Sequence, residues 1–316
     1  MKNINNSNLK DYNHFGDKLF HTIREKKSFL CFGLDPHLEL IPKVFQTKYN
    51  INKKIYSIDN IKIVEKFSLT LIEACLDFVP VIKLQIAFFE QLGPEGLKIL
   101  SRICKLIKNS STLCIIDAKR GDIGSTNRAY ANTFFDQSCP YPCDALTVNP
   151  WLGLDTIEVF LEKTKNKKGL FILVHTSNPG SHDIQEKKIN NNKKVYEDLA
   201  NNLKPMIERF KGKSGLSSIG IVAGATYKEQ LIKLRKTLSS APFLIPGFGA
   251  QGGTVSDAQF GLKKDKDHEN FYNCGLINSS RNLCFPDRAN KCKTIQDWKK
   301  VIQENLISIN LKLKET

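Results

Sequence analysis

The chain has 316 residues, of which 41% are hydrophobic and 25% are charged, a composition typical of a folded globular protein. No apolar run approaches the roughly 20 residues that a membrane-spanning helix needs, and the polar start, MKNINNSNLKDYN, lacks the apolar core of a signal peptide. We therefore expect a soluble cytoplasmic protein with no membrane partner.

The formal net charge of +15 makes nucleic-acid binding an alternative to consider. Many of the lysines lie in lysine- and asparagine-rich runs, such as KKINNNKK at residues 187–194, and the sequence has neither interleaved aromatic residues nor a helix-turn-helix signature. Such runs are typical of biased surface loops, and a positive field also attracts small anions. We expect no nucleic-acid partner; salt-dependent binding of random RNA or DNA would test the alternative.

The nine cysteines lie mostly within apolar stretches. The closest pair, Cys139 and Cys143, does not have the spacing of a metal finger. We expect buried thiols in a reducing compartment and no bound metal.

Short apolar runs alternate along the chain with amphipathic stretches of helical periodicity. Eight strands are predicted, at residues 28–35, 79–85, 112–119, 143–150, 169–176, 217–224, 242–249 and 271–280. Helices are predicted at residues 14–27, 64–78, 96–109, 126–137, 154–164, 194–210, 228–238 and 295–309.

Eight strand–helix units in a row favour a parallel (β/α)8 barrel, or TIM barrel, that forms one domain over residues 1–316 and has an extra N-terminal helix. The main alternative is an open doubly wound sheet, which usually has a glycine-rich turn after its first strand; here FGLDPH places Asp35 there. Polar segments at residues 46–60, 183–194 and 263–270 are interpreted as surface insertions.

Polar residues follow the carboxyl ends of the first five predicted strands. In a barrel these ends meet on one face, where active sites lie. The residues concerned are Asp35, Lys83, Asp117, Lys119, Asp122, Asn149, His175, Thr176 and Ser177.

The third strand ends in the most informative stretch, IIDAKRGDIGST. Asp117 and Lys119 are two residues apart and so point to the same side of a strand, and Gly121 allows a turn that brings Asp122 back toward them. Carboxylates on both sides keep the lysine protonated. Because burying charges costs desolvation energy, we interpret this array as a proton donor beside fixed negative charge; the alternative is a structural ion pair.

A second cluster follows the seventh and eighth strands. The stretch LIPGFGAQGGT at residues 244–254 exposes backbone N–H groups that suit a phosphate, and Arg281 supplies a guanidinium nearby. Loops after strands seven and eight form the usual phosphate site of barrels. The residues alone thus predict a lyase, isomerase or decarboxylase that acts on a sugar phosphate or a nucleotide.

The chain also resembles the orotidine 5'-phosphate decarboxylase family, in its type 2 branch. The motifs that carry the resemblance occur in the family's order over about residues 29–285: FGLDPH, IAFFEQ, DAKRGDIGSTNRAYA, TVNPWLGLD, VHTSNPGS, VAGAT and LIPGFGAQGG. The resemblance implies that orotidine 5'-monophosphate (OMP) loses its C6 carboxylate to give uridine 5'-monophosphate (UMP) and carbon dioxide, in pyrimidine biosynthesis, without a metal or organic cofactor.

The resemblance also implies roles for individual residues. Lys119 would protonate C6 and Asp117 would lie against the departing carboxylate. Asp122 would come from the partner subunit of a homodimer, with Thr126 touching the neighbouring ribose. Asp35 and Lys83 would bind ribose hydroxyls, and Lys83 would also bond to the charged array. Thr176 and Ser177 would contact the pyrimidine edge. Pro246 would contact the substrate, and Gln251 and Arg281 would bind the phosphate.

The sequence departs from the family at Gln85, where relatives often carry asparagine, so its contact with the site stays open. A separate orotate phosphoribosyltransferase is a possible partner. Two enzymatic alternatives remain: a magnesium-dependent sugar-phosphate enzyme of the same barrel superfamily, which tends to have glutamate at the place of Asp117, and an aldolase that forms an imine on its lysine.

Overall fold

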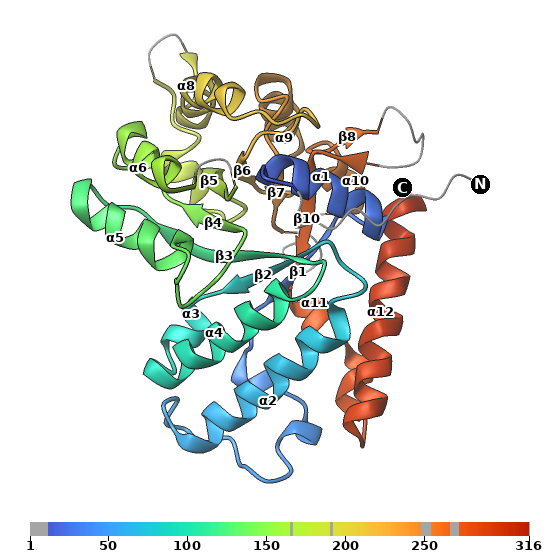
Figure 1. Ribbon diagram of the computed structural model, residues 1–316. Coiled ribbons are helices and arrows are strands. Elements are labelled where there is room, and N and C mark those ends of the chain that lie inside the picture. Colours follow the sequence, from blue (N-terminus) through green and yellow to red (C-terminus); the bar gives the residue numbers. More distant parts are fainter. Residues whose placement is uncertain (1–11, 165–166, 190–191, 248–253, 266–271, 316) are drawn as a thin grey trace.

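Eight parallel strands close into a barrel in this computed structural model, which describes residues 12–164, 167–189, 192–247, 254–265 and 272–315 (Figure 1). Each strand pairs with its predecessor, and β10 closes the ring between β7 and β1. The barrel consists of β1 (Leu30–Leu34), β2 (Val81–Gln85), β3 (Leu113–Arg120), β4 (Ala145–Val148), β5 (Gly169–His175), β6 (Ile219–Ala223), β7 (Phe243–Ile245) and β10 (Gly275–Ser279). The predicted TIM barrel is confirmed and the open sheet is excluded.

Helices surround the barrel, as Figure 1 shows. The longer ones are α1 (Phe15–Lys26), α2 (Ile58–Cys75), α4 (Gly93–Lys108), α5 (Gly124–Phe135), α6 (Leu154–Thr164), α8 (Val195–Arg209), α9 (Lys228–Thr237) and α12 (Ile295–Glu315), which packs against α2. Short helices follow several strands: α3 (Ala87–Glu90), α7 (Ser181–Ile184), α10 (Val255–Gln259) and α11 (Arg281–Cys284). The remaining elements are the 3-10 turns Leu38–Leu40, Lys43–Phe45 and Asp287–Lys291 and the hairpin of β8 (Lys263–Lys264) and β9 (Tyr272–Asn273).

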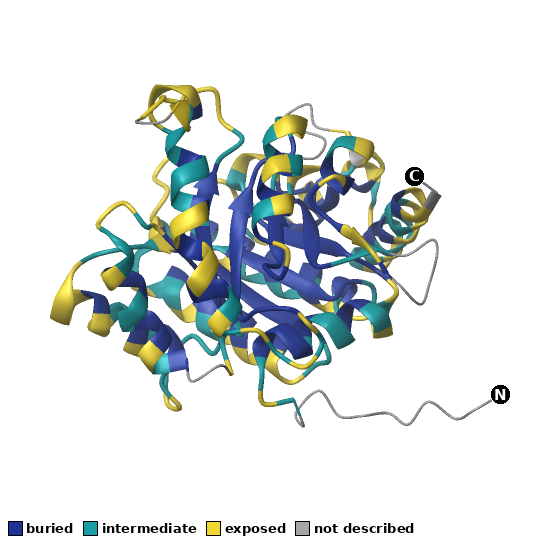
Figure 2. Cartoon of the chain, turned by 90° about the horizontal axis from the view of Figure 1, so that it is seen from above, coloured by how far each residue is buried: buried dark blue, intermediate teal, exposed yellow. Residues whose placement is uncertain are grey.

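The core lies in the barrel and between the barrel and its helices. Seen from above, the strands are buried, whereas the helices are buried on one face and exposed on the other (Figure 2). Strands buried on both faces explain why the sequence shows continuous apolar runs rather than alternation. In the part of the chain that the structure describes, no helix combines the length and apolar character needed to cross a membrane.

The extra N-terminal helix closes the barrel at the amino ends of its strands. Phe15 of α1 occupies the space that a Cβ atom at Gly169 would need and packs edge-on against Phe171 of β5. A side chain at position 169 would therefore displace the aromatic ring of α1.

The structure corrects some predicted boundaries. The eighth strand breaks at Cys274, whose φ of +65° lies in the left-handed region, so residues 272–273 pair with β8 rather than with the barrel. β7 ends before Pro246, which has no N–H to donate to the ladder. α2 begins at Ile58 rather than at residue 64, because the Ser57 hydroxyl caps it by accepting a hydrogen bond from the Asn60 N–H.

The predicted insertion at residues 46–60 is held by one buried side chain. The Asn60 amide nitrogen donates hydrogen bonds to the backbone carbonyls of Asn52, Lys54 and Ile55, and its oxygen accepts one from the Asn52 N–H. This loop is thereby fixed to the first turn of α2. The predicted insertion at residues 183–194 begins within α7, and the one at residues 263–270 begins with β8.

Candidate active site

Four charged side chains meet at the carboxyl ends of three neighbouring strands, β1, β2 and β3. Asp117 is the centre: one carboxylate oxygen lies 3.0 Å from Lys83 Nζ and the other lies 2.6 Å from Lys119 Nζ. Asp35 lies on the far side of Lys83, with 3.9 Å between Oδ1 and Nζ. We call Asp35, Lys83, Asp117 and Lys119 the charged array; the structure brings together these four residues that the sequence singled out.

Strand register and one unusual backbone angle produce this geometry. In the parallel pairing, Gln85 of β2 lies opposite Asp117 of β3. Lys119 has a φ of +47°, a left-handed conformation that a lysine rarely adopts. Its N–H donates to the Thr147 hydroxyl, 2.9 Å away, and that hydroxyl donates to Asp117, 2.8 Å away. The strained backbone at Lys119 is thus held by the neighbouring strand β4.

Asp117 and Lys83 stay ionised although both are buried, because each offsets the burial of the other. Burial alone would raise the pKa of Asp117, but the ammonium groups of Lys83 and Lys119 outweigh it and hold that pKa well below its usual range. Burial would likewise lower the pKa of Lys83, but Asp117 and Asp35 offset it and raise that pKa. Lys119 is the most accessible member, with 45% of its side chain exposed, whereas Asp117 has 10%. The Lys119 ammonium is therefore the member of the array that a bound molecule can most readily reach.

Two further residues join the array. Gln85, left open by the sequence, donates from its amide nitrogen to Asp117 Oδ2 over 3.1 Å. Thr147 was missed, although a buried polar residue in the apolar strand ALTV is a signal that could have identified it. Asn149, also singled out, instead accepts a hydrogen bond from the Trp151 N–H and so shapes the loop after β4.

The Asp35 side chain is 23% exposed, although one of its carboxylate oxygens is covered by the protein. Oδ1 is buried and accepts no hydrogen bond from the described residues, and its ion pair with Lys83 is long. Leaving such an atom unsatisfied costs free energy. The exposed part of the carboxylate can accept a hydrogen bond from a ligand hydroxyl, which fits the predicted ribose contact.

Asp122 and Thr126 lie apart from the array within one chain. Asp122 Oδ1 accepts a hydrogen bond from the Ile123 N–H over 2.7 Å, and in the described residues it forms no ion pair with Lys119 or Lys83. The expected return of Asp122 to its own strand end is therefore not seen. Thr126 is exposed in the first turn of α5.

Thr176 and Ser177 follow β5 at the same end of the barrel. The hydroxyl and backbone N–H of Thr176 are both hydrogen-bonded to the side chain of Gln185. Ser177 lies so close to the end of β6 that a Cβ atom on Gly224 would be 2.8 Å from its backbone. His175, the polar residue before them, faces the helices instead, against Tyr196 of α8 and Tyr227.

The predicted phosphate side is described only in part. Pro246 follows β7 and accepts a hydrogen bond from the Ala225 N–H, and Gly247 has a φ of +101°, which only glycine adopts readily. Gln251 and the other glycines of this loop lie outside the described residues. Arg281 begins α11, directly after β10, and is exposed.

Glu186, whose side chain is 8% exposed, fixes the surroundings of His175. Its carboxylate accepts hydrogen bonds from His175 Nε2 at 2.8 Å and Gln230 Nε2 at 3.0 Å, and it pairs with Lys194. Burial would raise the pKa of Glu186, but these hydrogen bonds outweigh it and lower the pKa to about 2. Burial lowers the pKa of His175 despite the neighbouring carboxylate.

This gives a prediction for Glu186→Gln. The carboxylate stabilises the fold fully above its unfolded-state pKa of 4.5, and that contribution is lost as the pH falls toward about 2. The variant should therefore unfold at a lower urea concentration than the wild type at pH 7. By the same linkage, the difference in unfolding free energy between the two proteins should shrink from pH 5 to pH 2, to about zero. A difference that stays constant over this range would contradict the assignment.

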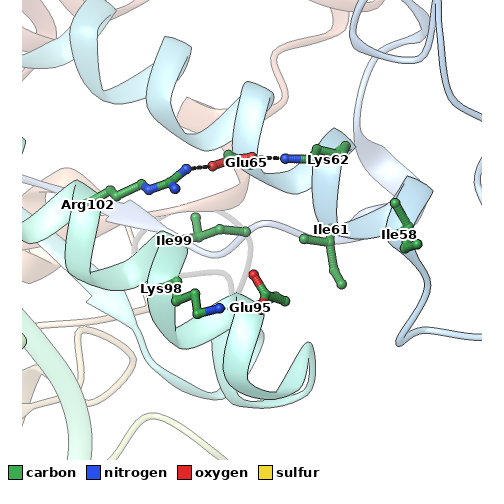
Figure 3. Close-up of a pocket in the computed structure, with 8 residues that line it drawn as sticks. All are labelled: Ile58, Ile61, Lys62, Glu65, Glu95, Lys98, Ile99 and Arg102. Atoms are coloured by element: carbon green, nitrogen blue, oxygen red, sulfur yellow. Dashed lines mark hydrogen bonds and ion pairs between the residues drawn. The ribbon is translucent and has the colours of Figure 1, made fainter.

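Other hollows lie away from the strand ends. A cavity of ≈ 190 Å³ lies between α2 and α4, with Ile58, Ile61 and Ile99 among its lining. Figure 3 shows its charged rim, where Glu65 pairs with both Lys62 and Arg102. Among the described residues, no group of three or more His, Cys, Asp or Glu side chains is arranged to hold a metal ion.

Comparisons with known proteins agree on one family. The model of the "Orotidine 5'-phosphate decarboxylase / HUMPS family" matches residues 28–283. An orotidine 5'-phosphate decarboxylase of Clostridium tetani is 41% identical over 268 residues, 84% of this chain and 87% of that protein. One of Rhodopirellula baltica is 34% identical and covers 95% of this chain and 99% of its own length. The structure of a putative orotidine-monophosphate decarboxylase from Toxoplasma gondii has a TM-score of 0.74 at 28% identity and covers 96% of this chain and 99% of its own.

Proposed function

The chain belongs to the orotidine 5'-phosphate decarboxylase family, and we propose that it converts OMP into UMP and carbon dioxide without a metal or organic cofactor. The observation that carries this proposal is the charged array at the carboxyl ends of β1–β3. It lies within the span that the family model matches, and it combines a buried carboxylate with an accessible ammonium. The enzyme is a carboxy-lyase of pyrimidine biosynthesis.

The array supports a mechanism of charge stabilisation. OMP would bind with its C6 carboxylate beside Asp117. The two negative charges repel each other in the bound substrate, and this repulsion is relieved as carbon dioxide leaves. The electron pair of the broken bond then remains on C6. The Lys119 ammonium stabilises this carbanion and donates its proton to it, forming the C6–H bond of UMP. Lys83, pinned between Asp35 and Asp117, keeps the carboxylate ionised and in place.

The rest of the site would bind the parts of OMP that do not react. We assign the ribose hydroxyls to Asp35 and Lys83, because the Asp35 carboxylate lies beside Lys83 and is partly exposed. We assign the pyrimidine edge to Thr176 and Ser177, and the substrate's phosphate end to Pro246, Gln251 and Arg281. Binding energy from this remote phosphate can support the chemical step.

The test is an assay of the purified wild type with OMP in excess chelator, followed by ultraviolet absorbance. Turnover at a rate that added magnesium does not raise would support both the reaction and the absence of a metal requirement. No turnover by a folded wild type would overturn the proposal. Turnover that requires magnesium would favour the metal-dependent alternative.

We also propose that the enzyme is a homodimer whose active sites are shared. Apolar side chains beside Asp122 are unusually exposed: Ile123 by 62%, Trp151 by 70% and Leu152 by 50%. The two loops that carry them adjoin, since the Asn149 N–H donates to the Arg120 carbonyl. An exposed apolar patch beside a catalytic end is typical of an interface. In a two-fold dimer, each chain would insert Asp122 and Thr126 into its partner's site.

A mixing experiment tests the sharing. Lys119→Ala and Asp122→Asn should each be nearly inactive alone. In a heterodimer, one site combines the intact Lys119 of one chain with the intact Asp122 of the other, so an equimolar mixture after subunit exchange should recover about a quarter of wild-type activity. No recovery, with exchange confirmed by native mass spectrometry, would contradict the shared site.

Four broader assignments are also proposals. We propose that residues 1–316 form one domain, and that a separate orotate phosphoribosyltransferase supplies OMP and associates with it, which co-purification would test. A cytoplasmic location is supported by the cysteines: all nine are free and seven are buried, as expected in a reducing compartment. We expect no nucleic-acid partner.

A further inference from the structure

The insertion between β5 and α8 contacts a residue that we assign to the pyrimidine edge. The Gln185 side chain follows α7 and reaches back to Thr176, where its oxygen lies 2.8 Å from the Thr176 N–H. Its nitrogen lies 2.9 Å from the Thr176 hydroxyl oxygen. One side chain therefore holds both the backbone and the hydroxyl of Thr176.

The direction of these hydrogen bonds follows from chemistry. A backbone N–H can only donate, so the Gln185 atom facing it must be the oxygen, and the amide nitrogen must then face the hydroxyl as a donor. The hydroxyl keeps its own proton for another acceptor, and Asn178 Oδ1 lies 2.7 Å away. Gln185 thus fixes the side-chain rotamer of Thr176. One lone pair of the Thr176 hydroxyl oxygen is left for a ligand.

The segment that carries Gln185 is itself anchored. The next residue, Glu186, binds His175, which directly precedes Thr176, and also Lys194 and Gln230. The Gln185 N–H and carbonyl bond to Ser181 and to the first turn of α8. Thr176 is held from both sides, through Gln185 and through the buried pair of His175 with Glu186.

We propose that Gln185 is a positioning residue of the base subsite, which acts by presenting Thr176 to the pyrimidine, and that the insertion is present to hold it there. This inference rests on the proposed function, because it takes the base of OMP and UMP as the ligand. It assigns a role to a polar, lysine-rich segment that otherwise has the composition of a surface loop.

The test compares two ligands that differ only in the base. UMP has the pyrimidine, whereas ribose 5-phosphate has the sugar and phosphate alone. Gln185→Met keeps the length of the side chain and removes both hydrogen bonds, so it should weaken UMP binding by about 10-fold. The affinity for ribose 5-phosphate, measured by displacement calorimetry, should change by less than about twofold, because no base is present.

Two further variants sharpen the result. Gln185→Glu retains the acceptor for the Thr176 N–H and loses only the donor, so its loss for UMP should be smaller, about threefold; it also carries the test if Gln185→Met does not fold. Lys187→Met places the same side chain two residues away, where it is exposed, and should leave both affinities unchanged.

The outcomes separate this inference from the proposed function. Equal losses for UMP and ribose 5-phosphate would show a merely structural role and overturn the inference, as would an unchanged affinity for UMP in Gln185→Met. Either result, with a wild type that turns over OMP, leaves the proposed function intact. A folded wild type that does not turn over OMP would overturn the proposed function itself.

Discussion

Lys119→Ala is expected to lower kcat/KM for OMP by at least about 10⁴-fold, because in the proposed mechanism the same ammonium supplies the proton for C6 and the charge that stabilises the carbanion. The free energy of unfolding should change little, since 45% of the Lys119 side chain is exposed and Lys83 still pairs with Asp117. The measurement is steady-state turnover of OMP beside a urea denaturation curve.

Lys98→Ala provides the matched control. Lys98 lies on α4, is 65% exposed and pairs with Glu95 three residues earlier. Its loss should leave kcat/KM within about twofold of the wild type. An active Lys119→Ala enzyme, with turnover within about tenfold of the wild type, would show that another group protonates C6.

Asp117→Asn is the second variant with a large expected effect, and it should lower both activity and stability. The amide keeps the shape of the carboxylate but leaves two ammonium groups without their central counter-charge. Removing one partner of a buried ion pair typically costs about 3 kcal/mol or more of unfolding free energy. Activity should fall by about 10³-fold or more, because Lys83 and Lys119 lose the charge that orients them.

Asp122→Asn separates the two effects. Asp122 forms no ion pair with the lysines of its own chain among the described residues, so its replacement should reduce activity with little change in unfolding free energy. Unchanged stability in Asp117→Asn would mean that the array does not hold Lys83 as we describe. Unchanged activity would remove Asp117 from the mechanism.

The barrel and the centre of the site were predictable from the sequence because both rest on local patterns. Alternation of apolar strands with amphipathic helices gives eight units, and residue spacing on a strand places Asp117 and Lys119 on one side. The placement of Lys83 and Asp35 beside them was also predictable, because parallel strands bring their carboxyl ends together. These features need no knowledge of which side chains touch.

The features that were missed depend on contacts between distant segments. The link from Thr147 to Asp117 follows from the pairing of β3 with β4, which no local spacing shows. The hydrogen bonds between Gln185 and Thr176 depend on how the insertion folds back onto β5. The sequence of that insertion indicates only a polar loop. The left-handed conformations of Lys119 and Cys274 likewise belong to tertiary structure, since neither residue type favours them.

The most direct test of the account is the fate of OMP in deuterium oxide with excess chelator. The account predicts one carbon dioxide for each OMP consumed and UMP that carries a single deuterium at C6, because the exchangeable protons of the Lys119 ammonium come from the solvent. Nuclear magnetic resonance and mass spectrometry of the product would measure both. Unchanged OMP, or UMP with hydrogen at C6, would contradict it.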